Sequence, residues 1–365
     1  PLAILLGLCD GTRDENALRV SFELRTGLRL DPLILRDLLS QLDEAMLLEG
    51  PRVEAAKASS LAAYRQASFR PPALAGHSYP ADPAALTAAL ARFSPPQEEE
   101  TDQPRAAEIR GLISPHIDFQ RGGSVYAKVW RRVAMAARAA EVVVIFGTDH
   151  LGGSLLTATH QHYATPWGVL PTAAWAVDAL TAALGDEDVF SSELNHRNEH
   201  SIEGAAVWLH HILGAGHVEI VPILCGSFQP FTDGEADPAE DGRLEAAVQA
   251  LRQVIGNRRS LVVAAADLAH VGPAFGDPAG LSPLEKAKLS SVDADLLAAA
   301  CSGHAEAFFA PLREERDRRR VCGLPPIYLA LRLLGQSQGE IVGYEQCPAD
   351  ADGGSVVSIA GVVFY

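Results

Sequence analysis

The sequence predicts a large three-layer α/β domain preceded by a small helical module. From residue 109 onward, short apolar runs rich in valine and isoleucine alternate with helical stretches, which is typical of strands buried on both faces of a parallel or mixed sheet. A proline-rich connector over residues 67–82 separates this part from a mostly helical beginning. The 365 residues suffice for one large core and one small core. We therefore expect an N-terminal module over residues 1–66 and an α/β domain over residues 67–365.

Residues 1–66 are expected to form a winged-helix-like module. Aspartates at expected helix starts and glycines at expected helix ends predict helices within residues 1–12, 13–27 and 31–50. Basic and acidic residues are almost equally frequent here, whereas a DNA-reading module is usually more basic. Two roles stay open for this module, namely docking of a peptide or protein and structural capping of the main domain.

The next segment predicts one helix and one loop. Asp82 followed by Pro83 is a typical helix start, and the helix is expected to continue toward Phe93. Residues 94–108 are polar and contain three prolines, which indicates a surface loop.

The α/β domain is expected to alternate strands with helices. Strands are predicted over residues 110–114, 141–147, 218–226, 260–267, 339–345 and 355–365. Helices are predicted near residues 123–139, 172–185, 201–214, 243–256, 283–301 and 324–335. Ligands of such folds gather beyond the carboxyl ends of the strands, so the site is expected there.

The composition indicates which kinds of partner and which cellular compartment to expect for the protein. A formal net charge of −16 and a pI of about 5.2 argue against nucleic acid as a partner. No apolar run approaches the ~20 residues that cross a bilayer, and the opening apolar stretch lacks the basic flank of a signal peptide. The five cysteines are widely spaced, which fits a reducing cytoplasm better than a disulfide framework.

Three predicted strands each end in a segment that holds one histidine and one aspartate. The pairs are His116 with Asp118, His150 with Asp149, and His270 with Asp267. A single histidine at a strand end is usually a hydrogen-bonded loop residue. Three such ends at one edge of a sheet favour a shared site instead.

Histidines in such a group suit a metal ion. Imidazole nitrogen binds zinc, iron, copper and nickel, and two histidines with one anionic ligand leave positions open for a substrate. A ligating histidine needs its second ring nitrogen held by an acceptor, for which Asp118, Asp149 and Asp267 are candidates. Asp118 is alternatively a simple turn residue.

Two further stretches carry chemically active side chains. Glu199, His200, Ser201 and Glu203 stand at an expected helix start, where Ser201 and Glu203 are also typical capping residues. Cys322 precedes another helix and follows an arginine-rich run, which predicts a stabilised thiolate, with an inert buried thiol as the alternative. Cys225, at the end of a strand, is expected to serve packing.

Eight short motifs in series give a resemblance to a known family. They are "AGHSYPAD", "SPHIDF", "GTDH", "NEHSIE", "PILCG", "AADLAHVG", "CGLPPI" and "SIAGVVFY". From residue 71 to residue 365 the chain resembles the Memo family, which includes the bacterial AmmeMemoRadiSam system protein B group. Residues 1–66 lie outside that match and are similar to a PqqD-type winged helix.

The resemblance implies a fold shared with class III extradiol dioxygenases, which hold Fe(II) with two histidines and a glutamate. In Memo-like proteins a cysteine replaces the carboxylate, so the implied metal ligands are His116, His150 and Cys322. The implied catalytic residues are His270 as acid and base, His200 in the pocket, and Asp267 behind the ligands. A thiol is softer than a carboxylate and favours copper or zinc, which weakens the case for ring cleavage.

The resemblance leaves three functions open. The first is a non-haem oxidoreductase that uses iron or copper on a small-molecule substrate. The second is a non-catalytic metal- or peptide-binding protein on the same scaffold, and the third is hydrolysis with zinc. Bacterial members are encoded beside a radical-SAM protein and an AMMECR1-like protein, which implies both as partners.

Overall fold

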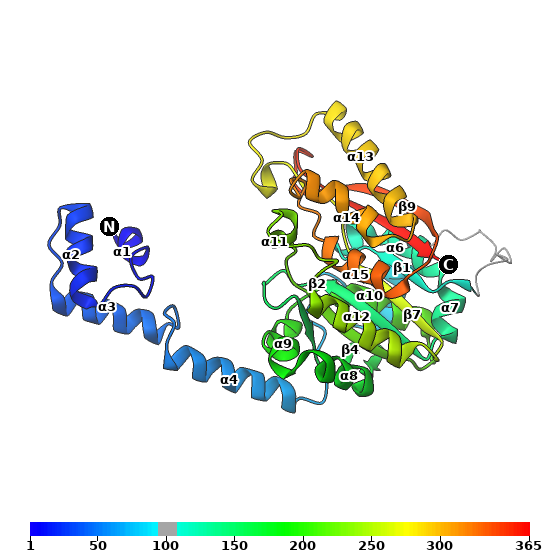
Figure 1. Ribbon diagram of the computed structural model, residues 1–365, viewed down its shortest axis with the longest axis horizontal. Coiled ribbons are helices and arrows are strands. Elements are labelled where there is room, and N and C mark those ends of the chain that lie inside the picture. Colours follow the sequence, from blue (N-terminus) through cyan, green and yellow to red (C-terminus); the bar gives the residue numbers. More distant parts are fainter. Residues whose placement is uncertain (94–107) are drawn as a thin grey trace. The chain divides into compact units, whose positions relative to one another are not determined.

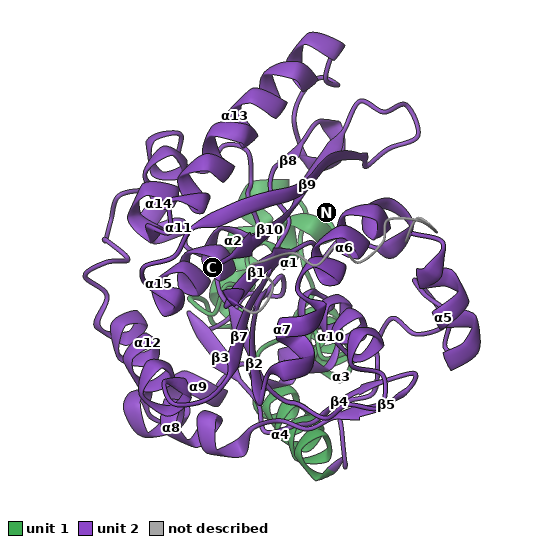
Figure 2. Cartoon of the chain, turned by 90° about the vertical axis from the view of Figure 1, so that its right-hand side faces the viewer, with its two compact units in different colours: residues 1–66 green, residues 67–365 purple. Residues whose placement is uncertain are grey.

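The computed structural model describes residues 1–93 and 108–365. These residues form two compact units, Pro1–Gln66 and Ala67–Tyr365, shown in different colours in Figure 2. Except for its last residue, the predicted loop over residues 94–108 lies outside the described residues. Among the helices that the structure describes, none is long and apolar enough to cross a membrane.

The smaller unit consists of four helices, and residues 1–66 contain no strand. The helices are α1 (Leu2–Leu6), α2 (Glu15–Thr26), α3 (Pro32–Glu44) and α4 (Pro51–Gln66). Asp14 and Asp31 begin α2 and α3 by accepting hydrogen bonds from backbone N–H groups of the first turn. The third predicted helix ends before Gly50, and α4 follows as a helix that the pattern did not predict. The relation to a winged helix stays a prediction.

The larger unit is built on an eight-stranded mixed sheet in the order β3-β6-β2-β7-β1-β10-β8, with β9 paired to β10. Its strands are β1 (Gly111–Ser114), β2 (Val142–Thr148), β3 (Leu156–Ala158), β6 (Glu219–Cys225), β7 (Ser260–Ala265), β8 (His270–Val271), β9 (Gly339–Pro348) and β10 (Val356–Phe364). Strands β6, β2, β7 and β1 are parallel, whereas β3, β8, β9 and β10 pair antiparallel. A separate hairpin joins β4 (Tyr163–Thr165) to β5 (Gly168–Leu170).

Helices cover both faces of this sheet, which confirms the predicted three layers. They are α5 (Pro83–Ala91), α6 (Phe119–Arg132), α7 (Ala134–Ala139), α8 (Ala174–Leu184), α9 (Asp186–Phe190), α10 (Ser201–Leu213), α11 (Gln229–Thr232), α12 (Gly242–Ile255), α13 (Pro283–Cys301), α14 (Ala305–Glu314) and α15 (Leu324–Leu334). Figure 1 shows their course along the chain, and Figure 2 shows α6, α7 and α10 across the sheet from α8, α12 and α15. Alternate residues of β2 enter opposite cores, so Val142 and Val144 pack on one face and Val143 packs on the other.

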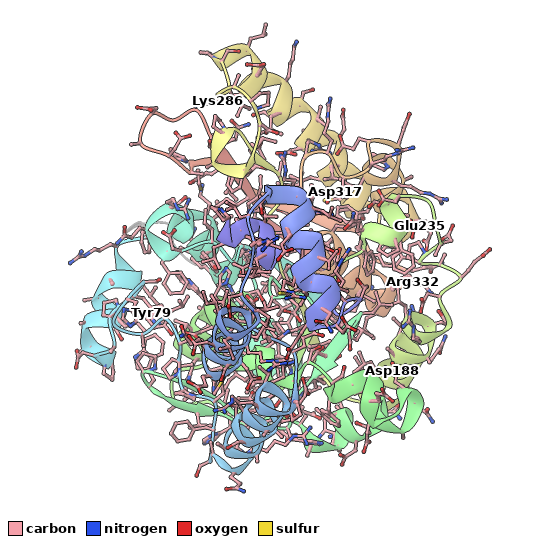
Figure 3. The ribbon with its side chains drawn as sticks, turned by 90° about the vertical axis from the view of Figure 1, so that its left-hand side faces the viewer. Tyr79, Asp188, Glu235, Lys286, Asp317 and Arg332 are labelled. Atoms are coloured by element: carbon pink, nitrogen blue, oxygen red, sulfur yellow. The ribbon has the colours of Figure 1, made fainter. Side chains whose placement is uncertain are left out.

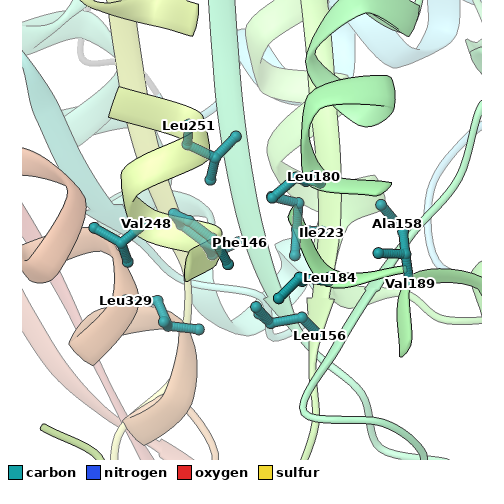
Figure 4. Close-up of a pocket in the computed structure, with 11 residues that line it drawn as sticks. Phe146, Leu156, Ala158, Leu180, Leu184, Val189, Ile223, Val248, Leu251 and Leu329 are labelled. Carbon is teal, nitrogen blue, oxygen red and sulfur yellow. The ribbon is translucent and has the colours of Figure 1, made fainter. Parts of the chain in front are cut away.

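The face covered by α8, α12 and α15 is a closed apolar core. Figure 4 shows Phe146 and Ile223 of the sheet beside Leu180, Leu251 and Leu329 of the helices. The space between them is about 10 Å³, and every residue that lines it is apolar. A void of that size and polarity stays dry, so this space contributes to packing and not to a site.

Apart from α14 (Ala305–Glu314), a ten-residue helix with Pro311 inside it, the missed elements are short segments. The sequence pattern missed β3, β4, β5, β8, α9, α11 and α14. The single helix predicted over residues 123–139 is in fact two helices, α6 and α7, of which α6 begins at Phe119. Strands of two or three residues are too short to show a hydrophobic period, so no pattern marks them.

The register of the parallel strands brings three chain segments together. Ser114 of β1 pairs with Ala265 of β7, Gly147 of β2 pairs with the same residue, and Thr148 pairs with Cys225 of β6. The carboxyl ends of these strands therefore end at one edge of the sheet. Whatever follows them within two or three residues lies close together.

Candidate metal centre

Three histidines meet at that edge. His116 and His150 follow β1 and β2 by two residues, and His200 stands directly before α10. One ring nitrogen of each lies within 4.8 Å of the others, and this is the one such group of three found among the described residues. The rings of His150 and His200 stack with centroids 4.8 Å apart, and the ring of His116 meets both edge-on.

Oxygen acceptors at Nδ1 leave the Nε2 lone pairs of these histidines available for a ligand, and the thiol of Cys322 contacts that of His116. The Nδ1 atom of His116 lies 3.0 Å from the carbonyl oxygen of Ala265. The Nδ1 atoms of His150 and His200 lie 3.1 and 3.0 Å from Oε1 of Glu199. A carbonyl or carboxylate oxygen accepts only, so each Nδ1 carries the proton and each Nε2 keeps its lone pair.

Glu199 orients two histidines at once. Besides both imidazoles, its carboxylate accepts hydrogen bonds from the backbone N–H groups of His150, His200 and Ser201. Burial raises the pKa of this carboxyl, but the hydrogen bonds from His150 and His200 outweigh it and hold the pKa well below its usual range. Glu199 therefore stays ionised and fixes both rings in one tautomer.

The start of α10 is held tightly against β2. The hydroxyl of Ser201 donates to the carbonyl oxygen of Thr148 at 2.8 Å. A side chain on Gly147 would meet Ser201 Oγ and Ile202 Cγ1 at 2.6 Å, so only glycine permits this approach. The contact places His200 beside His150.

One expectation for this helix start is wrong. The helix begins at Ser201, as predicted, and residues 193–197 form a short 3-10 helix before it. Neither Ser201 nor Glu203 caps the helix, because Glu203 is buried in an ion pair with Arg70 at 2.6 Å. This pair fixes the chain that precedes α5 to α10.

Asp267 positions His116 through the backbone. Its Oδ1 atom accepts hydrogen bonds from the N–H groups of His116 and Ile117 at 2.8 and 3.2 Å. Its Oδ2 atom lies 3.7 Å from Nε2 of His116. Asp267 thus stands behind the histidines.

The other two candidate orienting aspartates have different tasks. Asp118 caps α6 by accepting from the N–H of Arg121, and it pairs with the Arg121 guanidinium at 2.6 Å. Asp149 accepts from the side-chain amide of Asn195. The prediction that these two hold the histidine rings is wrong, because Glu199 and a backbone carbonyl do so.

The thiol of Cys322 also reaches the site. Its Sγ atom lies 3.2 Å from Nε2 of His116, although it does not belong to the three-nitrogen group within 4.8 Å. Gly323 allows the approach, since a side chain there would lie 2.3 Å from the carbonyl oxygen of Asp267. The loop before it contains Arg316, Asp317 and Arg320 with positive φ, conformations that are costly for such residues.

The arginines of that loop do not stabilise a thiolate. Arg319 is buried in an ion pair with Asp293 at 2.6 Å, and Arg320 pairs with Asp277 at 2.7 Å. Burial, with the charge of Asp267, raises the pKa of the Cys322 thiol well above its usual value. The prediction of a stabilised thiolate is therefore wrong for the protein without a metal ion. A bound metal ion is what deprotonates such a group.

His270 lies in the adjoining cavity. Its Nδ1 atom is shared between the carbonyl oxygens of Leu268 and Arg320 at 3.1 and 3.2 Å, which leaves Nε2 as a proton acceptor. Burial lowers its pKa from the ordinary value of 6.5. The ring is thus neutral near neutral pH.

A cavity of about 460 Å³ opens beside the three histidines and His270. Its walls combine apolar and aromatic residues, among them Tyr79, Phe119 and Phe275, with the polar side chains of the centre. The size and the convergence of polar groups beside apolar surface are typical of a small-molecule site.

The electrostatics of the histidines differ. His116 is buried, and burial together with the neighbouring His150 lowers its pKa well below 6.5. Burial also lowers the pKa of His200, but the hydrogen bond that its Nδ1 donates to Glu199, with the negative charge of that carboxylate, outweighs burial and raises the pKa overall. His116 is therefore neutral and ready to bind a cation. His200 is protonated more often than His116, so a cation that binds it has to displace a proton.

The predicted site residues thus gather in one place. His116, His150 and His200 form the nitrogen group, Cys322 contacts it, and Asp267 and His270 flank it. Sequence reasoning missed the orienting role of Glu199. Its position directly before His200 was the available signal.

The donor set fits a transition-metal ion. Imidazole–metal bonds of about 2.0–2.1 Å place ligand nitrogens about 3–4 Å apart, so the three rings need only small rotations to bind one ion. The acceptors on Nδ1 are those that ligating histidines require.

Comparisons with known proteins give matches to one family. The family described as Memo-like protein matches residues 70–363. A MEMO1 family protein of Aquifex aeolicus is 25% identical over 386 aligned residues, which cover 100% of this chain and 91% of the relative. Those of Methanopyrus kandleri and Thermus thermophilus are each 28% identical. Their alignments cover 81% and 88% of this chain and 98% and 90% of the relatives.

Proposed function

The chain belongs to the Memo-like protein family, and from this premise we propose that His116, His150 and His200 hold a redox metal ion for the oxidation of a small organic molecule. One observation carries the proposal. Three imidazoles, each with one ring nitrogen within 4.8 Å of the others and with its Nδ1 atom beside an oxygen acceptor, meet beside a thiol and a cavity of about 460 Å³.

The donors narrow the choice of metal. Imidazoles suit iron, copper and zinc, and the thiol of Cys322 adds a soft donor that copper and zinc favour. We propose iron or copper for a redox reaction, with zinc as the alternative for hydrolysis.

A bound ion of this kind supplies Lewis acidity and electron transfer. The chain itself binds and orients the substrate between Tyr79, Phe119 and Phe275, whose apolar surfaces exclude water. His270, with Nε2 free, accepts the proton of a substrate hydroxyl or amine. Asp267 keeps the His116 backbone in place meanwhile.

The test begins with metal content. We expect the anaerobically purified chain to carry iron or copper, and we expect His116→Ala combined with His200→Ala to abolish it. His304→Ala is the matched control, because this exposed histidine hydrogen-bonds only near itself. Substrate oxidation is then assayed with O₂ and a series of catechols. If His116→Ala combined with Cys322→Ala retains the wild-type metal content, the proposed site is wrong.

A non-catalytic metal-binding role is the second candidate, and one observation favours it. With Cys322 bound, three histidines and a thiolate supply four protein ligands, and closed four-ligand sites are typically structural. Azide distinguishes the two, since it binds an open site and changes the metal spectrum but leaves a closed site unchanged. Cys322→Ser would open the closed site and restore the azide response.

The roles beyond the site remain proposals with narrower support. We propose that the protein is located in a reducing cytoplasm, because all five cysteines are free.

A docking role of the smaller unit is supported by its exposed large apolar side chains: Leu2, Ile4, Leu6, Val20, Leu24, Leu28, Leu33, Ile34, Met46 and Leu47. Partnership with a radical-SAM protein and an AMMECR1-like protein rests on the family resemblance alone. Recovery of either partner with the full chain but not with residues 67–365 would support docking by this unit.

A further inference from the structure

A second cavity reaches the metal centre. It encloses about 380 Å³ and shares only His150 with the cavity described above. Figure 3 shows Tyr79 and Asp317, one from each cavity, at separate places on the larger unit. The centre is therefore reached by two routes that meet at one ligand.

The two routes differ in charge. Asp149, Asp233 and Asp317 line the second cavity against one guanidinium, that of Arg316. In the first cavity the charges of Asp118 and Arg121 cancel in an ion pair of 2.6 Å, and Asp267 is buried beneath backbone N–H groups. The second cavity attracts cations, whereas the first suits an apolar molecule.

The metal-binding side chains of the second cavity also change toward the metal centre, from carboxylates to a thiol and an imidazole. Asp233 is exposed, whereas Asp149 is buried and adjoins His150 in the chain. Cys322 and His150 close the inner end, and Sγ of Cys322 lies 3.2 Å from Nε2 of His116. Carboxylate oxygens hold transition metals weakly, while thiolate and imidazole hold them well, so affinity rises along the path.

We propose that the second cavity is the entry route of the metal ion. A hydrated divalent cation enters past Asp233 and Asp317 and passes to His150 and Cys322, from where it reaches His116 and His200. The first cavity is left for the organic substrate. The inference rests on the proposed metal centre.

The test measures loading kinetics with Co²⁺, whose visible absorption changes when protein ligands bind it. We expect the double variant Asp233→Asn with Asp317→Asn, which removes two negative charges, to slow Co²⁺ association about tenfold at low salt. Clefts lined by carboxylates raise cation on-rates by about 10–10³-fold. We expect Ser227→Trp, at the exposed rim, to slow it as well by obstruction. The final absorption amplitude should stay unchanged, because all ligands are retained.

Two controls make the result specific. Asp186→Asn with Asp188→Asn removes two exposed charges of α9 outside both cavities and should leave the association rate unchanged. Ala349→Trp obstructs the first cavity and should also leave the rate unchanged. The entry route is overturned if Ala349→Trp slows loading while the variants of the second cavity do not. A wild-type chain that binds no Co²⁺ would overturn the metal centre itself, a distinguishable outcome.

Discussion

The residue that organises the site is Glu199, a carboxylate outside the group of candidate ligands. It holds the Nδ1 atoms of His150 and His200 and three backbone N–H groups. We predict that Glu199→Gln weakens metal binding by about 10–100-fold, the usual cost of losing such an orienting partner. The amide NH₂ replaces Oε2, the acceptor of the His150 backbone N–H, and the uncharged Oε1 holds both imidazoles less strongly. Competition with a metal-sensitive dye measures the affinity.

Asp118→Asn is the matched control for that change. It also removes one carboxylate two residues from a histidine, but asparagine caps a helix as well as aspartate does. Its metal affinity should equal that of the wild type. An equal loss in both variants would mean that the effect is general electrostatics and not orientation.

A second residue-scale prediction concerns pH. Burial raises the pKa of the Asp317 carboxyl to about 6 from its ordinary 3.8, so the folded state holds this proton more tightly than the unfolded state. Stability is therefore lost as pH rises from about 4 through about 6. Asp317→Asn keeps the acceptor for Val321 N–H and cannot ionise. The Tm of the variant should exceed that of the wild type by a margin that is near zero at pH 4 and full at pH 7; a constant margin would contradict the assignment.

For single residues, the sequence could predict which side chains come together at the site, but not which hydrogen-bond partner each of them has. Since parallel strands end at one edge, the approach of His116 and His150 was predictable from two strand ends. The role of Glu199 was not, because it depends on how α10 approaches β2. Asp118 looked like an orienting residue only because it stands two residues from His116.

At the scale of elements, the contact of α10 with β2 positions His200. Gly147→Ala would bring a methyl group within 2.6 Å of Ser201 Oγ and Ile202, so α10 must shift. We predict a loss of about 1–3 kcal/mol in the free energy of unfolding, the usual cost of overpacking, together with weaker metal binding. Denaturant unfolding and metal titration measure the two effects.

Gly242→Ala serves as the control for Gly147→Ala. It lies in the first turn of α12, where an added methyl group meets nothing within 4 Å. Alanine is the better helix former, so this variant should be as stable as the wild type or slightly more stable. Unchanged metal binding in Gly147→Ala would show that α10 does not position His200.

The long elements were predictable because both faces of the sheet are buried and every central strand is a continuous apolar run. The short β3 and β8 and the loop that carries Cys322 were not. That loop adopts positive φ at Asp317 and also at Arg316 and Arg320, where an arginine rarely adopts it. The buried pair of Arg319 and Asp293 and the contact of Gly323 with Asp267 hold it instead.

At the scale of the whole molecule, the family match begins at residue 70, close to the division between the two units. All candidate ligands and both cavities belong to the larger unit. We predict that residues 67–365 alone fold and bind the same metal with the same stoichiometry and affinity as the full chain. A truncated protein that folds, judged by circular dichroism, but binds no metal would contradict this.

The layered architecture of the larger unit followed from the sequence, since alternating buried strands and helices permit few other arrangements. The smaller unit was less predictable. Its α4 carries Pro51 at its first position and lacks a clear apolar face, so no hydrophobic pattern predicted it; its alanine-rich composition was the available signal.

The most direct test of the metal centre is a crystal structure of the anaerobically purified chain with anomalous data at the iron, copper and zinc edges. We predict one anomalous peak within bonding distance of a ring nitrogen of His116, His150 and His200. Its distance from Sγ of Cys322 then decides between a closed and an open site. A fully occupied metal elsewhere, or no metal together with unchanged histidine positions, would contradict the proposed metal centre.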